Sequence, residues 1–187
     1  RKNKLLSFEI ESKMKSLAQN VSSGDTNNYE AQAAQLYWKQ LFGSEFKRDR
    51  NLSGINELLN YGYMILRAAT ARSIIGTGLQ PSLGIHHKNI KNQFCLVDDI
   101  MEVFRPSVDF VVYDLVKNHR QIYLNKITKL ELSKIISLDF ETNKGASPLS
   151  NCLTKLAVSV YKSYENKSPQ LDLPKTLLPT YFIDGKI

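Results

Sequence analysis

One long apolar stretch, residues 53–75, constrains the fold more than any other part of the chain. Its apolar residues cover almost every side of a helix, and Gly76-Thr77-Gly78 with Pro81 beyond are expected stop signals. Glu57 and Arg67 are among the charged side chains within it that exclude a span through lipid. The stretch is therefore predicted to form the central helix of a buried core.

The rest of the chain is also predicted to be helical. Apolar residues recur at helical steps in several further segments, while alternation of period two is absent, so the fold class is all-α. The predicted helices cover residues 10–21, a segment capped by Asn27 or Asn28 and ending at 42, residues 94–105 up to Pro106, residues 108–119, and a segment that opens with Ser147 as the N-cap and Pro148 at the first helical position. Residues 127–140 fit either a helix or short extended pieces, and the proline-containing tail 168–187 is expected to be extended.

Composition sets the class of protein. A chain of 187 residues with 42% hydrophobic and 23% charged residues is predicted to fold as one globular domain, residues 1–187. Cys95 and Cys152 lie in apolar surroundings, which favours buried thiols in a reducing, cytoplasmic compartment; no leader or membrane span is expected. The net charge of +7 favours an acidic partner such as DNA or RNA, although a solvated basic surface would give the same number.

Glu30 is the first residue with possible chemistry. Ala33, Ala34, Tyr37 and Leu41 follow it at spacings of one helix face, so Glu30 belongs to an apolar stripe. A buried carboxylate needs an ion pair, a capping role or a metal ion. The alternative is a solvent-facing acid that complements the helix dipole in the first turn.

Two further groups lie later in the chain. His86 and His87 follow a glycine turn, a modest metal signal that is more often a hydrogen-bonded pair. Asp99 and Glu102 are three residues apart and share a helix face, where their charges repel unless a cation lies between them, and Arg105 offers Glu102 an ordinary ion-pair partner. Two carboxylates and one imidazole suit Mg²⁺ or Mn²⁺ better than a structural zinc ion.

Three motifs in one order resemble the CRISPR-associated protein one family of integrases. Residues 58–66 contain Asn-Tyr-Gly-Tyr, residues 78–87 read Gly-Leu-Gln-Pro-Ser-Leu-Gly-Ile-His-His, and residues 99–106 read Asp-Ile-Met-Glu-Val-Phe-Arg-Pro. Upstream, residues 30–38 are similar to the acidic helix of the family, with Ala31 where a glycine is frequent. The style of these motifs is similar to that of type II systems.

The resemblance implies a helical catalytic domain with a divalent metal site. The metal ligands and catalytic residues map to Glu30, His87 and Glu102, with His87 rather than His86 in the ligand position and Asp99 as a nearby acid that supports the ion or the DNA. It also implies a metal-dependent endonuclease and integrase that joins a DNA 3′-hydroxyl to a repeat phosphodiester by transesterification, thereby inserting new spacers into CRISPR arrays.

The family also implies partners. They are double-stranded DNA, a second copy in the full-length protein and the small CRISPR-associated protein two, the last two through an N-terminal β-rich domain that we do not expect within residues 1–187. Among the basic residues of this chain, we expect Arg67, Arg72 and Lys88 to bind the DNA backbone. Two rival hypotheses remain, a non-catalytic basic helical DNA-binding module whose acids form ion pairs, and a helical adaptor that binds no DNA.

Overall fold

The computed structural model describes residues 8–22, 25–87 and 89–177. As predicted, the chain is mainly helical, with one small sheet, and it divides into two compact units, Arg1–Leu52 and Ser53–Ile187. That the chain is a single domain stays a prediction. Within the described ranges no helix is both long and apolar enough to cross a membrane. Cys95 and Cys152 are both buried free thiols, in agreement with their apolar sequence surroundings.

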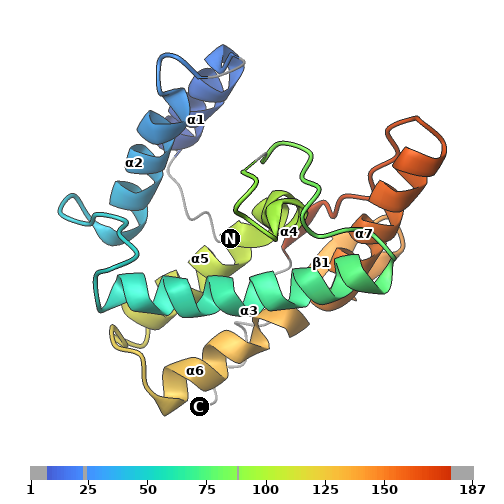
Figure 1. Ribbon diagram of the computed structural model, residues 1–187. Helices are drawn as coiled ribbons and strands as arrows, with labels where there is room; N and C mark the ends of the chain where they lie inside the picture. The colour runs from blue at the N-terminus through green and yellow to red at the C-terminus, as the bar shows by residue number, and fades with distance from the viewer. Residues whose placement is uncertain (1–7, 23–24, 88, 178–187) are drawn as a thin grey trace. The chain divides into compact units, whose positions relative to one another are not determined.

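The first unit contains two helices that lie side by side, α1 (Phe8–Asn20) and α2 (Tyr29–Phe42) (Figure 1). Asn28, one of the two residues predicted to cap α2, does occupy the N-cap position, but its side chain does not cap the helix. Asn28 adopts a left-handed conformation (φ 53°) and makes no side-chain capping bond. The chain folds back there, so the Asp25 carboxylate accepts the first free helical N–H groups, those of Tyr29 at 2.8 Å and Glu30 at 2.9 Å.

The second unit is built around α3 (Ile55–Gly76), the central helix that the apolar stretch predicted. It packs against α4 (Cys95–Met101), α5 (Arg105–Lys117), α6 (Lys126–Ser133) and α7 (Leu149–Glu165), as Figure 1 shows. A 3-10 turn, η1 (Glu102–Phe104), separates α4 from α5, and Pro106 lies in the first turn of α5. The predicted interruption at this proline is confirmed, because a proline without an N–H group fits the first turn of a helix and not its interior.

Gly62 lets α3 and α5 approach closely. A Cβ atom at this position would lie 2.5 Å from Cγ1 of Val108 on α5, closer than real Cβ contacts come. Glycine inside a helix costs about 1 kcal/mol relative to alanine, so the crossing of the two helices explains why it is used here. The glycine thus places residues on neighbouring turns of α3 beside the first turns of α5.

A small antiparallel sheet is the part that the all-α prediction omitted. β1 (Asp139–Thr142) lies between β2 (Gly145–Pro148) and β3 (Thr176–Leu177), after a second 3-10 turn, η2 (Lys134–Ser137). The ambiguous segment 127–140 therefore contains both helix and strand, and β3 agrees with an extended tail up to residue 177. Residues 178–187 of that tail lie outside the described residues.

The predicted start of α7 is wrong by one position. Ser147 belongs to β2 and Pro148 is the N-cap, with Leu149 as the first helical residue. Ser147 pairs with Phe140 across the hairpin, and this strand pairing takes the serine away from the capping position.

Candidate active site

Asp99, on α4, binds the loop of residues 77–94 that connects α3 to this helix and is named the histidine loop below. Its carboxylate accepts hydrogen bonds from the backbone N–H groups of Ile85 (2.5 Å), His86 (2.9 Å) and His87 (3.2 Å), and Nδ1 of the His87 ring lies 2.5 Å from Asp99 Oδ1. Only 7% of the Asp99 side chain is exposed. Both carboxylate oxygens are therefore engaged within the protein, and Asp99 acts as the clamp of the histidine loop.

Gly84 makes this clamp sterically possible. A Cβ atom there would lie 2.2 Å from the His87 carbonyl oxygen, 2.8 Å from Cβ of Cys95 and 3.0 Å from Asp99 Oδ2. Two of these neighbours are a backbone atom and the Cβ of a buried residue, neither of which can give way by rotating a side chain. The glycine that the sequence motif contains is thus required by the close packing of the loop on α4.

We expect Gly84→Ala to displace the histidine loop while the helical core stays folded. The added methyl group must push the His87 backbone away from Asp99, which breaks the clamp. Hydrogen exchange should show faster exchange of the amide groups of residues 85–87 and unchanged protection in α3 and α7. Gly76→Ala is the matched control, since no atom lies within 4 Å of a Cβ at position 76. Equal amide exchange in Gly84→Ala and the unmodified chain would show that the loop does not need this glycine.

The clamp fixes the orientation and electrostatics of His87. The hydrogen bond that Asp99 accepts from the His87 ring is the largest influence that raises the pKa of His87. Burial lowers this pKa, but the charges of Asp99, Glu102 and Asp98 raise it further. Burial alone would raise the pKa of Asp99, but the bonds that it accepts from the loop outweigh burial and lower that pKa. Because Nδ1 faces Asp99, Nε2 is the ring nitrogen that remains for a ligand.

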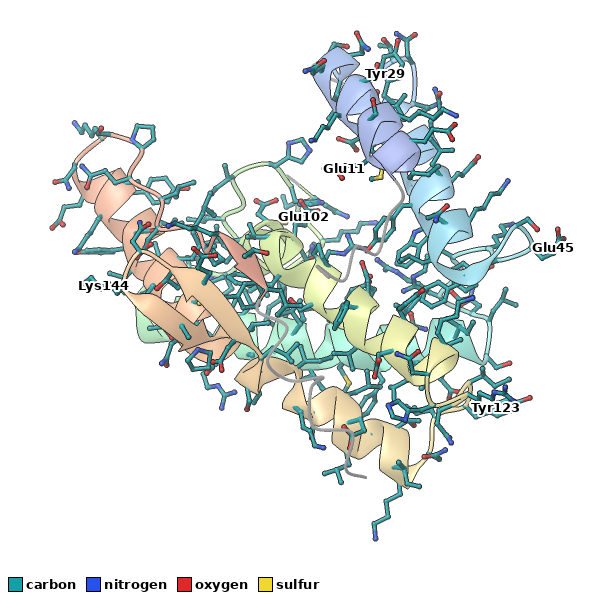
Figure 2. The ribbon with its side chains drawn as sticks, turned by 180° about the vertical axis from the view of Figure 1, so that it is seen from behind. Glu11, Tyr29, Glu45, Glu102, Tyr123 and Lys144 are labelled. Atoms are coloured by element: carbon teal, nitrogen blue, oxygen red, sulfur yellow. The ribbon has the colours of Figure 1, made fainter. Side chains whose placement is uncertain are left out.

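Glu102 follows α4 and is exposed on the η1 turn (Figure 2). Its charge contributes to the raised pKa of His87, so the imidazole and this carboxylate lie within electrostatic reach of each other. The structure thus places both predicted ligands of the second unit around α4 and bonds the histidine loop to Asp99, while a shared metal site of His87 and Glu102 stays a prediction. The alternative in which Glu102 pairs with Arg105 is not what the structure shows: among the described residues there is no ion pair between these two side chains.

Asp98, which the sequence analysis left without a role, holds the second half of the loop. It accepts bonds from Arg67 Nε (2.7 Å) and Nη2 (2.9 Å) and from Asn92 Nδ2 (2.7 Å). Burial raises the pKa of Asp98, but these bonds outweigh it, and the pKa lies below its usual range. Arg67 also lies over the Phe94 ring, 4.8 Å from its centroid. The prediction that Arg67 holds DNA therefore concerns a side chain that already fixes the loop, although 41% of it is exposed.

Arg105 lies beside Tyr63, and its place was also missed. The guanidinium carbon is 4.9 Å from the centroid of the Tyr63 ring, and the Tyr63 hydroxyl donates a hydrogen bond to the buried carboxylate of Asp109. Arg105 itself is exposed and stands three residues after Glu102, on the same side of the helical turn. The only sequence signal for this group was an aspartate inside the apolar run of residues 108–112.

The remaining predicted residues lie elsewhere. Glu30 is exposed in the first turn of α2, as the alternative for this residue predicted, and it belongs to the first unit, whereas His87 and Glu102 belong to the second. Their convergence stays a prediction. Arg72 is exposed on α3, and Lys88 lies outside the described residues. In the part of the chain that is described, no three His, Cys, Asp or Glu side chains form a group able to hold a metal ion.

The sequence matches one protein family and several of its curated members. Residues 3–143 match the family model described as "CRISPR associated protein Cas1". The chain is 36% identical over 167 residues to the CRISPR-associated endonuclease Cas1 of Neisseria meningitidis serogroup C (strain 8013), a match that covers 88% of this chain and 55% of the relative. It is 31% identical over 159 residues to CRISPR-associated endonuclease Cas1 2 of Pyrobaculum aerophilum, covering 82% of this chain and 53% of the relative.

A solved structure shares the fold. It is described as a casposase bound to integration product, and it matches with a TM-score of 0.67 at 19% identity, covering 88% of this chain and 62% of that one. The chain spans about half the length of the curated relatives it matches. The family model covers most of the chain and both the acidic helix and the histidine loop, and the chain belongs to the Cas1 family.

Proposed function

We propose that this chain carries the active site of a metal-dependent DNA endonuclease and integrase that inserts new spacers into CRISPR arrays. The observation that carries the proposal is the Asp99 clamp, which bonds Nδ1 of His87 and leaves Nε2 for a ligand, while the exposed Glu102 lies within electrostatic reach of the ring. Two relatives of the chain are named as CRISPR-associated endonucleases, and the structure with the same fold is described as bound to integration product. Both descriptions support DNA as the substrate.

The donor set fits a divalent metal ion. An imidazole whose other nitrogen is bonded to a carboxylate is a common arrangement in metal sites, because the carboxylate fixes the ring and increases its basicity. His87 and Glu102 would supply two ligands from the second unit and Glu30 a third from α2. Two carboxylates and one imidazole suit Mg²⁺ or Mn²⁺. When bound, such an ion would polarise a phosphodiester and stabilise negative charge on the oxygen that leaves.

The reaction is a transesterification at phosphorus. The 3′-hydroxyl oxygen of the incoming DNA forms a bond to phosphorus, the bond from phosphorus to the 3′-oxygen of the repeat strand breaks, and the proton lost by the attacking hydroxyl balances the one that the leaving oxygen gains. The protein contributes by positioning these groups, and Asp99 keeps the histidine loop in one arrangement throughout.

Basic side chains around the site would hold the DNA backbone. Arg105 is the strongest candidate in the second unit, because it is exposed beside Glu102 and has no acidic partner among the described residues. Arg67, Arg72 and Lys88 are the further candidates from the sequence. A second copy of the chain and the small CRISPR-associated protein two are the proposed protein partners, and the type II assignment stays part of the proposal.

Measurements of Mn²⁺ affinity test this function directly. We expect Glu30→Gln, His87→Ala and Glu102→Gln each to weaken Mn²⁺ binding by about tenfold or more, because each removes one ligand. Calorimetry or electron paramagnetic resonance measures this affinity. Strand transfer and DNA nicking should require the ion and fall in the same variants. Glu45→Gln in the first unit and Glu165→Gln in the second are matched controls, since both glutamates are exposed and lie outside the proposed site.

The outcome for Glu30 is decisive for the ligand set. A Glu30→Gln chain with unaltered Mn²⁺ affinity would remove α2 from the site. DNA binding that falls steeply with salt, combined with no metal binding and no strand transfer in the unmodified chain, would instead favour the non-catalytic DNA-binding module.

A further inference from the structure

We propose that Tyr63 and Asp109 are positioning residues that fix Arg105 as the phosphate-binding side chain beside Glu102. The inference rests on the proposed function and assigns work to two residues outside the predicted ligand set. All three side chains belong to the second unit, Tyr63 on α3 and the other two on α5. The arrangement forms a chain of contacts from the buried core to the exposed guanidinium.

The contacts connect the buried Asp109 through Tyr63 to the exposed Arg105. Asp109 is only 4% exposed and lies one turn after Arg105 on α5. It accepts the hydroxyl hydrogen bond of Tyr63, which fixes the ring against α5. The Arg105 guanidinium then lies over this ring, 4.9 Å from its centroid, while the side chain remains exposed. A guanidinium that lies over an aromatic face still presents several N–H groups that can bond a phosphate.

The surroundings of the Tyr63 hydroxyl favour its protonated form. Burial raises the pKa of Tyr63 far above its usual range, and the charge of Asp109 and the hydrogen bond to it raise the pKa further, while Arg105 lowers it by a smaller amount. The hydroxyl therefore serves as the donor to Asp109 that holds the ring. Without it, Arg105 on an exposed helical turn has many rotamers, and a bidentate contact with phosphate requires the guanidinium plane to be ordered.

The salt dependence of DNA affinity tests the inference. Each phosphate contact contributes about 0.9 to the slope of log affinity against log salt for duplex DNA, so Arg105→Gln should lower the slope by about that amount. Tyr63→Leu removes the support and should lower the slope in the same direction. In the double variant the slope should fall no further than in Arg105→Gln alone, because both changes remove the same contact. If Tyr63→Leu does not fold, Tyr63→Phe, which deletes only the hydroxyl, takes its place in the cycle.

Lys129→Gln is the matched control for the loss of one positive charge. Lys129 on α6 lies over Tyr61 in the same kind of contact, 5.7 Å from the ring centroid. It does not belong to the proposed site, so its removal should leave the salt slope of DNA affinity unaltered. The proposed support of Arg105 is overturned by additive effects of the Tyr63 and Arg105 changes, or by a Tyr63→Leu slope equal to that of the unmodified chain. If the unmodified chain shows no salt-dependent affinity for DNA, the proposed function itself fails. If it does bind DNA in this way but Arg105→Gln has the same salt slope as the unmodified chain, only the Arg105 assignment is overturned.

Discussion

Glu102→Gln should abolish most of the DNA strand transfer that we propose for this chain and leave its folding intact. The change removes one negative ligand charge and preserves the shape of the side chain, and charge stabilisation by a bound metal ion is worth several kcal/mol, so we expect a rate loss of about 100-fold or more. Glu102 is exposed and carries no ion pair with Arg105, so the metal-free melting temperature should stay the same or rise as repulsion from the neighbouring Asp99 falls.

Thermal melts with and without Mn²⁺ separate a ligand from an ordinary surface acid. An ion that binds only the folded chain raises its melting temperature, and Glu102→Gln should remove that increase, whereas Glu165→Gln should keep it. An identical Mn²⁺ effect in the Glu102→Gln and unmodified chains, or none in either at millimolar metal, counts against Glu102 as a ligand.

Asp99→Asn is expected to have the second-largest effect, through the loop rather than through the ion. The carboxylate accepts three backbone N–H groups and faces Nδ1 of His87, whereas an amide offers one oxygen and turns an NH₂ group toward the other donors. The N–H groups of Ile85 and His86 are exposed and that of His87 is half-buried, so losing these bonds should lower the free energy of unfolding by about 1 kcal/mol. Disturbing a carboxylate that orients a metal-binding histidine typically costs 10–100-fold in metal affinity.

Nuclear magnetic resonance of the His87 ring in the metal-free chain checks the cause. Since the bond to Asp99 is the largest influence that raises the pKa of His87, that pKa should fall toward its ordinary value in Asp99→Asn. The ring signals of His119, which lies 3.3 Å from Asp114, serve as an internal chemical-shift reference. A His87 titration unaffected by Asp99→Asn would show that the clamp does not operate in solution.

Periodicity identified the central helix because α3 is buried against four other helices, and only an almost wholly apolar helix can be so placed. The break before Pro106 followed from the missing N–H of proline. The histidine loop and the acids of α4 were found as separate signals, and the resemblance joined them. Their bonding could not be deduced, since the fold alone decides which carboxylate faces the loop and which faces Arg67.

The missed elements share a physical cause. The hairpin of β1 and β2 has four paired residues in each strand, too few for an alternating pattern to stand out. Asp25 caps α2 from a position outside the usual capping site, because the left-handed turn at Asn28 brings it back. Tyr63 and Asp109 are 46 residues apart and meet only where α3 crosses α5. Local sequence carries no signal for such a contact.

The Gly62 crossing also restricts the order in which this sequence can evolve. A methyl group at position 62 meets Cγ1 of Val108 at 2.5 Å, so Gly62→Ala pushes α5 away from α3 and separates Arg105 from Tyr63. A prior Val108→Ala substitution removes that obstacle at the expense of core packing. Alanine should therefore replace glycine at position 62 only in sequences that already have a small residue at position 108. The two positions should vary together among relatives.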